Sequence, residues 1–200
     1  ALQEAMKLTE TSIPEVKIID PQIFPDARGY FCETYQKQKF AALGITQEFV
    51  QDNESFSSKG VLRGLHFQRP PFAQAKIVRV LEGEILDLAL DLRAGSPTFG
   101  QHAAVRLSLE NHRMLYIPAG FAHGFVVLSQ TARIAYKCDA LYAPQAEDAI
   151  DALDKALAID WLCDPGALIR SEKDARARSW ESYLAAPCFS YQNQHLIPAF

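Results

Sequence analysis

Residues 60–76, GVLRGLHFQRPPFAQAK, set a histidine, long cations and a glutamine among apolar residues that favour a β-strand. Side chains two residues apart share a face of an extended segment, so His66 and Gln68 lie together and Arg63 opposite. Arg63 and His66 face one pocket only if a bulge intervenes, which Gly64 between them permits. Such a set can hold a ligand or a metal ion, or move a proton. The alternative is a half-buried edge strand with a hydrogen-bonded core histidine.

A second histidine follows a proline–glycine turn at 118–123, PAGFAH, which fits the P-x-G-x-x-H pattern of the second cupin motif. Gly60 and His66 lie near the first motif, G-x5-H-x-H, but Gln68 occupies the place of its second histidine. Transition-metal sites usually gather at least three N, S or O ligands, and His66 with His123 supplies two. We therefore predict no metal. A purely structural role for His123 after its turn is the alternative.

Short strands must position these residues, because extended segments recur at spacings near ten residues. Between residues 84 and 92, leucines alternate with Asp87, Ala89 and Asp91, which predicts one buried face. This organisation favours an all-β sandwich or barrel. The predicted strands cover 16–24, 30–35, 49–56, 76–92 with a break at Glu82 and Gly83, 103–107, 113–117, 124–128 and 131–138, with 103–107 and 113–117 forming a hairpin.

Helices are predicted in three places. Residues 36–43 form a short helix that ends before Gly44. From Pro144 the composition changes to Ala, Asp and Leu at helical spacing, and residues 170–184 give the strongest helical pattern. With 200 residues and 48% hydrophobic content, the chain suffices for one core. We predict a single domain over residues 1–200, with a β core at 16–143 and a helical or irregular segment at 144–200.

Composition excludes several classes of partner. The net charge is −4 without blocks of like charge, which argues against a nucleic acid or an anionic membrane as the main partner. No apolar run approaches about 18 residues, and the first residues lack a signal-peptide core, so we expect a cytoplasmic protein. The cysteines show neither a metal spacing nor the density of a disulfide scaffold, and we expect reduced thiols at Cys32, Cys138, Cys163 and Cys188.

Several blocks carry a specific resemblance. VLRGLHFQ, QAKIVRVLEGEILDLALDLRAGSPTFGQ, YIPAGFAHGFVVLS and YKC followed by LYAP resemble the dTDP-4-dehydrorhamnose 3,5-epimerase family, in the same order and at near-identical spacing. The resemblance runs from about Phe24 to Asp174. It implies a mainly β, cupin-like jelly roll with a few short, mostly C-terminal helices. It also implies a homodimeric enzyme that inverts C3 and C5 of a dTDP-4-keto-6-deoxyhexose without a metal, nicotinamide or other cofactor.

The resemblance also implies catalytic roles. Both carbons lie next to the C4 ketone, so each can lose a proton to a base if the enolate is stabilised. His66 matches the family's general base, and Asp174 the carboxylate that orients it and favours its protonated form. Lys76 matches the cation near the ketone oxygen, and Tyr136 the proton donor across the sugar. Ser171 to Asp174, SEKD, is equally a helix capping box, which is the alternative for Asp174.

Further positions match the family's contacts with the nucleotide-sugar, and Tyr142 matches its stacking partner for thymine. Cations among them can supply charge-assisted bonds to a diphosphate. Ordinary surface charges, and core aromatics at Tyr136 and Tyr142, are the alternatives. The chain departs from the family at Asp148, Ala152 and Leu153, where a basic residue and a Trp–Asp pair are usual. The matching binding positions are Arg28, Glu33, Gln51, Asp52, Asn53, Arg63, Lys76, His123, Glu147 and Lys173.

Two other functions remain open from the sequence. An enzyme that inverts only one carbon, or that acts on a related dTDP-ketosugar, would keep the same base, acid and cation. A non-catalytic cupin that binds a sugar or a metal would not need the combination of His66, Lys76, Tyr136 and Asp174. That combination favours an enzyme.

Overall fold

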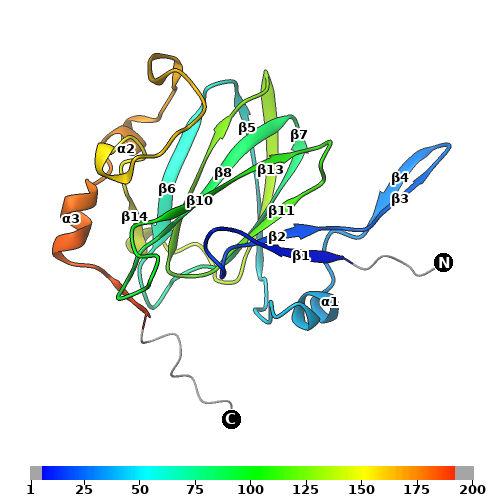
Figure 1. The fold of residues 1–200 in the computed structure, drawn as a ribbon, viewed down its shortest axis with the longest axis horizontal. Helices are drawn as coiled ribbons and strands as arrows, with labels where there is room; N and C mark the ends of the chain where they lie inside the picture. Colours follow the sequence, from blue (N-terminus) through cyan, green and yellow to red (C-terminus); the bar gives the residue numbers. More distant parts are fainter. Residues whose placement is uncertain (1–5, 192–200) are drawn as a thin grey trace, which may run out of the picture.

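The computed structural model describes residues 6–191, in which two antiparallel β-sheets pack face to face (Figure 1). The six-stranded sheet has the order β1-β2-β11-β7-β13-β5, and the five-stranded sheet β10-β8-β12-β6-β14. The first comprises β1 (Lys7–Glu10), β2 (Lys17–Asp20), β11 (Met114–Ile117), β7 (Lys76–Glu82), β13 (Thr131–Cys138) and β5 (Gln51–Ser58). The second comprises β10 (His102–Ser108), β8 (Glu84–Asp91), β12 (Phe121–Val127), β6 (Leu62–Gln68) and β14 (Glu147–Ala149). The predicted mainly β, cupin-like fold is confirmed, as a sandwich of two open sheets.

The core between the sheets is built from alternating strand positions. Val78 and Ile134 from the six-stranded sheet meet Ile85, Ala89 and Phe125 from the five-stranded sheet in one buried cluster. Successive strands β7 and β8 lie in different sheets, so the chain crosses between layers at residue 83. The alternation of side chains therefore gives each sheet one face for this core.

The outer face of the five-stranded sheet is covered by the C-terminal segment. Leucines of β8 form a second buried cluster with Trp161 and Tyr183, and the Tyr183 hydroxyl donates to the carbonyl oxygen of Leu92 at 2.7 Å. Figure 1 shows α2 (Glu172–Ala175) and α3 (Trp180–Ala185) beside this sheet. Both faces of β8 are consequently buried, whereas the sequence predicted one. Residues 1–5 and 192–200 of the predicted single domain lie outside the described residues.

Four predicted elements differ in the structure. The strand predicted at 16–24 is interrupted at residues 21–22 and gives β2 and β3 (Ile23–Asp26), which lie in separate sheets. The helix at 170–184 is two helices, because Arg178 pairs in a β-bridge with Ile150 and Ser179 caps a new start. The hairpin of 103–107 and 113–117 is wrong, since β10 pairs with β8 and β11 with β2 and β7. The helical spacing after residue 144 gives only single 3₁₀ turns, where Asp154 and Asp164 accept bonds from nearby backbone N–H groups. These turns are Pro144–Ala146, Lys155–Leu157 and Pro165–Ala167.

The N-terminal part carries a projecting hairpin. Strands β3 (Ile23–Asp26) and β4 (Gly29–Cys32) pair only with each other and extend away from the body (Figure 1). The aromatic side chains of Phe24, Tyr30 and Phe31 are exposed on it. The helix predicted at 36–43 is confirmed as α1 (Lys37–Ala42), which covers part of the outer face of the six-stranded sheet. A last short strand, β15 (Phe189–Ser190), pairs with β9 (Arg93–Ala94).

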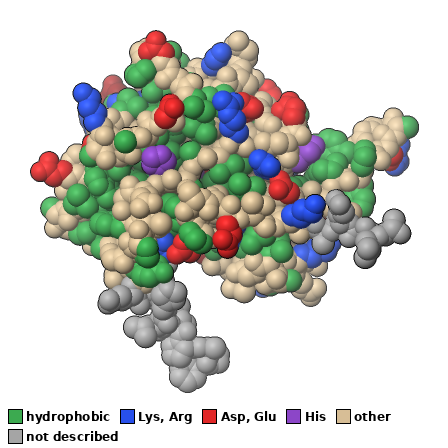
Figure 2. All heavy atoms as spheres, in the orientation of Figure 1, with side chains coloured by type: hydrophobic (Ala, Val, Ile, Leu, Met, Phe, Trp, Pro, Cys, Tyr) green, Lys and Arg blue, Asp and Glu red, His purple; other side chains and the backbone are tan. Residues whose placement is uncertain are grey.

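The surface shows mixed charge. In Figure 2, acidic and basic side chains alternate over the visible face without a block of one sign. The four cysteines are free in the structure. Among residues 6–191, the helices are too short or too polar to cross a bilayer.

Candidate active site

Gly64 sets how β6 lies against β12. His66 is the direct cross-strand partner of His123, but the register shifts by one residue before Phe125 pairs with Arg63. Gly64 has a φ of 117°, and a Cβ there would lie 2.6 Å from the Cα of Gly124. A side chain would push the strands apart, so this position requires glycine. The irregularity that glycine permits here is therefore present, as a shift in the strand register.

His66 and Asp174 form a close pair. The Nε2 atom of His66 lies 2.6 Å from Asp174 Oδ1, and Asp174 Oδ2 accepts from the Gly64 backbone N–H at 3.2 Å. The Asp174 side chain is 5% exposed and that of His66 34%, so the ring has access to solvent while its partner does not. Burial would raise the pKa of Asp174, but hydrogen bonds and charge from His66 and the Gly64 N–H lower it overall.

The capping alternative for Asp174 is also resolved. Ser171 caps α2, since its side-chain oxygen accepts from the backbone N–H of Asp174 at 3.1 Å. The carboxylate of Asp174 turns away from the helix start toward His66. The residue therefore helps the cap through its backbone and pairs through its side chain.

Lys76 and Tyr136 lie on adjacent strands of the six-stranded sheet. The Nζ atom of Lys76 is 5.8 Å from the centre of the Tyr136 ring, and Lys76 is the cross-strand partner of Cys138. Burial lowers the pKa of Lys76, although the Cys138 thiol and nearby carboxylates oppose this shift. Burial also raises the pKa of Tyr136, with Cys138 adding to the effect and Asn53 opposing it. The phenol is thus held protonated at neutral pH, as a proton donor must be.

One ring contact joins the two layers. The His123 and Tyr136 rings lie 6.5 Å apart between centres, and His123 is in turn the cross-strand neighbour of His66. The histidines come from the five-stranded sheet, and Tyr136 with Lys76 from the six-stranded sheet. The four side chains therefore come together between the two layers, on interior strands of both sheets.

A second group of predicted residues lies beside this cluster. The Tyr142 hydroxyl donates to Glu147 Oε2 at 2.8 Å, and Lys173 Nζ lies 2.6 Å from the same oxygen. Burial would raise the pKa of Glu147, but its bonds with Lys173 and Tyr142 lower it overall. Gln51 Oε1 accepts from the Tyr142 backbone N–H at 2.9 Å. These contacts connect Tyr142 and Glu147 with Lys173, the residue that precedes Asp174.

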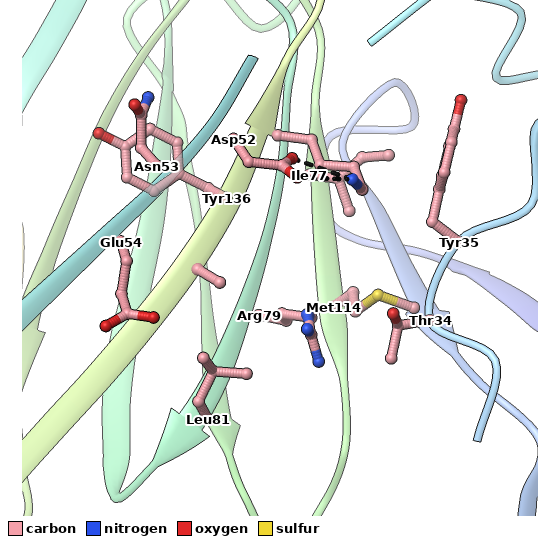
Figure 3. Close-up of a pocket in the computed structure, with 12 residues that line it drawn as sticks. Thr34, Tyr35, Asp52, Asn53, Glu54, Ile77, Arg79, Leu81, Met114 and Tyr136 are labelled. Atoms are coloured by element: carbon pink, nitrogen blue, oxygen red, sulfur yellow. Dashed lines mark hydrogen bonds and ion pairs between the residues drawn. The ribbon is translucent and has the colours of Figure 1, made fainter. Parts of the chain in front are cut away.

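Polar side chains also extend along β5 and β6. Gln51 Nε2 donates to Asn53 Oδ1 at 3.1 Å, and Asn53 faces Tyr136 across the β5–β13 pairing (Figure 3). The Arg63 Nε group donates to the Ser57 hydroxyl at 3.1 Å, and its charge reaches the Tyr136 phenol. Arg63 is therefore near the cluster despite its strand parity, because of the shift at Gly64.

Three predicted binding residues are not brought to this cluster within one chain. Arg28 is 90% exposed at the hairpin tip, where it pairs with Asp26. Glu33 pairs with Lys39 at 2.7 Å. Asp52 pairs with Lys137 at 2.9 Å on the outer face of the six-stranded sheet, at a hollow of about 500 Å³ (Figure 3).

Sequence reasoning missed the partner of His123. Asp87 Oδ1 lies 2.6 Å from His123 Nε2, and the aspartate is fully buried. Its other oxygen has no hydrogen-bond partner among the described residues. The available signal was an acid placed between leucines in the middle of a mostly apolar strand. It was hidden because β8 was expected to expose one face.

Metal ligation finds little support in the arrangement. Among residues 6–191, no group of three or more His, Cys, Asp or Glu side chains is placed to hold a metal ion. The amide of Gln68, at the place of a cupin ligand, bonds instead to Phe72, Leu141 and Ala143. The absence of a cofactor remains a prediction.

Two packed sheets with an imidazole–carboxylate pair on one layer, and a lysine and a tyrosine on the other, define a cupin-like protein equipped for proton transfer. The chain belongs to the dTDP-4-dehydrorhamnose 3,5-epimerase family, whose sequence profile matches residues 10–182. The dTDP-4-dehydrorhamnose 3,5-epimerase of Pseudomonas aeruginosa is 49% identical over 185 residues, which cover 92% of this chain and 99% of that relative.

Solved structures agree with this membership. The dTDP-6-deoxy-D-glucose-3,5-epimerase of Legionella pneumophila, in complex with dTDP-4-keto-L-rhamnose, superposes with a TM-score of 0.89 at 50% identity, covering 94% of this chain and 99% of that one. A 3'-monoepimerase of Streptomyces bikiniensis, in complex with dTDP-quinovose, gives a TM-score of 0.84 at 30% identity, covering 92% and 94%.

Proposed function

We propose that this chain inverts C3 and C5 of dTDP-4-dehydro-6-deoxy-D-glucose to give dTDP-4-dehydro-L-rhamnose, as an isomerase of dTDP-L-rhamnose biosynthesis. The observation that carries the proposal is the His66–Asp174 pair on one layer with Lys76 and Tyr136 on the other. Family membership at 49% identity supports the same reaction.

His66 is the proposed base. Its ring is partly exposed, so a bound sugar can reach it, and Asp174 fixes its orientation through Nε2. The other ring nitrogen, Nδ1, then takes the proton from C3 or C5. Each of these carbons is acidified by the neighbouring ketone, so the step forms an enolate.

Lys76 and Tyr136 complete the reaction. The half-buried Lys76 ammonium stabilises the enolate oxygen, because a fixed charge is most effective where solvent is excluded. Tyr136 donates its phenolic proton to the carbon from the face opposite His66. The sugar loses one proton to His66 and gains one from Tyr136, so the configuration at that carbon is inverted. Proton exchange with solvent then returns both side chains to their starting states before the second carbon reacts.

Nucleotide binding is proposed for the neighbouring groups. Tyr142 stacks on thymine, while Arg63 and Lys173 neutralise the diphosphate together with the polar side chains of β5. These cations are needed locally because the chain carries a net charge of −4. His123, held by Asp87, contacts the substrate beside Tyr136.

The second candidate is inversion of one carbon only. It is favoured by the structural similarity to the 3'-monoepimerase of Streptomyces bikiniensis, at 30% identity. The proposed base, cation and acid serve either reaction. The 50% identity to the 3,5-epimerase of Legionella pneumophila makes double inversion the better proposal.

A twofold homodimer accounts for the residues that lie away from the cluster. Arg28 is on a projecting hairpin with exposed aromatics, and a hollow lies open on the outer face of the six-stranded sheet. We infer that the hairpin of one subunit brings Arg28 to the site of the other.

Coexpressing Arg28→Ala and His66→Ala chains tests whether Arg28 acts in the partner's site. Mixed dimers hold one complete site, so about a quarter of wild-type activity should return; persistent inactivity of the mixture contradicts the crossing.

A cytoplasmic location is also inferred, since the four thiols are free and a reducing compartment keeps them so. It stays a prediction.

The reaction is tested by incubating the chain with dTDP-4-dehydro-6-deoxy-D-glucose in deuterated water and following C3 and C5 by NMR. Deuterium should enter at both carbons and the product should have the L-rhamno configuration. A His66→Ala variant should lose roughly 10²- to 10⁴-fold in rate while keeping dTDP affinity. Label at one carbon alone favours the second candidate. Wild-type exchange in the variant rejects His66 as the base.

A further inference from the structure

The chain that carries Tyr142 is held from behind by one buried side chain. Gln68 is 4% exposed, and its Nε2 group donates to the carbonyl oxygens of Phe72 at 2.7 Å and Leu141 at 3.2 Å. Its Oε1 atom accepts from the Ala143 backbone N–H at 2.8 Å. The glutamine thus binds the residues on both sides of Tyr142. We call residues 141–143 the tyrosine strap.

Glutamine is the side chain that fits these three partners. A primary amide offers two N–H donors and a carbonyl acceptor, which match two carbonyls and one backbone N–H. A histidine has only two ring nitrogens, and a glutamate has no donor when ionised. The full set of bonds matters because a buried polar group without a partner is costly. The position that holds a metal ligand in metal-binding cupins is therefore committed here to the strap.

We propose that Gln68 is a positioning residue for the nucleotide base: it fixes the tyrosine strap so that the Tyr142 ring stands ready to stack on thymine. This inference rests on the proposed function. Tyr142 is 54% exposed, so its ring gains little orientation from packing and depends on the backbone that carries it and on the bond from its hydroxyl to Glu147. Holding a contact surface in its bound geometry improves affinity, because less conformational entropy is lost on binding.

Strand β6 also connects the residues that position Tyr142 with the proposed catalytic base His66. Gln68 follows His66 by two residues on β6 and shares its face, while β14 pairs with β6 so that Glu147 lies opposite Gln68. Glu147 in turn accepts from the Tyr142 hydroxyl. The ring is therefore fixed at its backbone and at its hydroxyl relative to the strand that bears the proposed catalytic base.

The test is Gln68→Met, which keeps the length of the side chain and removes its hydrogen bonds. Calorimetric Kd for dTDP should rise about tenfold, within the range for loss of an aromatic platform for one base. The kcat of epimerisation should change less than about twofold. The Kd for inorganic pyrophosphate, which has no base, should not change. Gln74→Met is the matched control, since Gln74 donates to the Ala140 carbonyl at 2.7 Å, just outside the strap, and should leave all three values unchanged.

A double-mutant cycle identifies the route of the effect. Tyr142→Ala should also weaken dTDP about tenfold, and the double variant should be scarcely weaker than either single one, because both remove the same platform. Additive losses of about 100-fold would overturn the proposal, as would an unchanged dTDP Kd in Gln68→Met or equal weakening of pyrophosphate. If Gln68→Met unfolds in a thermal melt, Gln68→Asn carries the same prediction, because the shorter amide stays neutral but cannot reach all three partners. Wild-type chain that binds dTDP but does not epimerise would reject the proposed reaction and leave this test intact.

Discussion

Replacing Asp174 by asparagine separates its pairing role from its place at a helix start. The change keeps the shape of the side chain but removes the charge, and one amide oxygen must replace two carboxylate oxygens that serve His66 and Gly64. A hydrogen bond to a charged group contributes about 1.5–3 kcal/mol, so the free energy of unfolding should fall by about 2 kcal/mol. Loss of a general base costs roughly 10²- to 10⁴-fold, and a mispositioned His66 should lose about 10²-fold in kcat.

The assay combines NMR of deuterium exchange with urea denaturation and dTDP titration. Asp174→Asn should slow exchange and epimerisation together while the Kd for dTDP stays unchanged. The reason is that Asp174 contacts His66 and is not one of the proposed nucleotide-binding residues. Ser171→Ala is the matched control. It removes the cap of α2 and should cost about 1 kcal/mol of stability with kcat within about twofold of wild type.

The pH dependence of the free energy of unfolding is an independent test of the Asp174 pairing. Burial would raise the pKa of Asp174, yet the bonds to His66 and Gly64 bring it below its ordinary value of 3.8. A lowered carboxyl pKa stabilises the fold fully above 3.8 and loses this contribution as pH falls through the folded value. The difference in free energy of unfolding between wild type and Asp174→Asn should therefore become smaller in acid.

Equal kcat losses in Asp174→Asn and Ser171→Ala would refute the pairing argument and leave Asp174 a helix-start residue.

Three further predictions follow from the same geometry. Tyr136→Phe removes only the donor hydroxyl, so deuterium exchange by His66 should continue while epimerisation falls; equal losses measured by NMR would assign Tyr136 to proton abstraction instead. Exhaustive chelation should leave kcat unchanged, and loss with EDTA followed by recovery with a divalent ion would replace the metal-free mechanism. Light scattering at micromolar concentration should give twice the chain mass, whereas a monomer would contradict the crossing of Arg28 between subunits.

Local patterns predicted the strands that carry the site. The strand predicted at 131–138 is β13, and in it Tyr136 lies on the same face as the buried Ala132 and Ile134. Gly64 was singled out because only an irregular strand brings Arg63 and His66 together, and the register shift supplies that irregularity. These features could be predicted because each depends on neighbours within a few residues.

Long-range pairing could not be predicted in this way. The contact between His123 and Asp87 depends on β12 lying next to β8, and the two strands are distant in sequence. The segment at 170–184 has the composition of one helix, but a β-bridge to Ile150 and an ion pair between Arg178 and Asp148 interrupt it. In the second case a tertiary contact outweighs the local helical preference.

The two-layer fold suits a reaction that must work on both faces of a sugar. Inversion needs one group to remove a proton and another to supply one from the opposite side, so the two groups cannot share a strand face. Here the pair His66 and Asp174 is anchored on the five-stranded sheet and α2, whereas Lys76 and Tyr136 are anchored on neighbouring strands of the other sheet. Because the core between the sheets fixes their separation, the distance between proposed base and acid is set by packing and not by loop conformation. In the proposed mechanism, a substrate bound between the two layers meets the base and the acid from opposite sides.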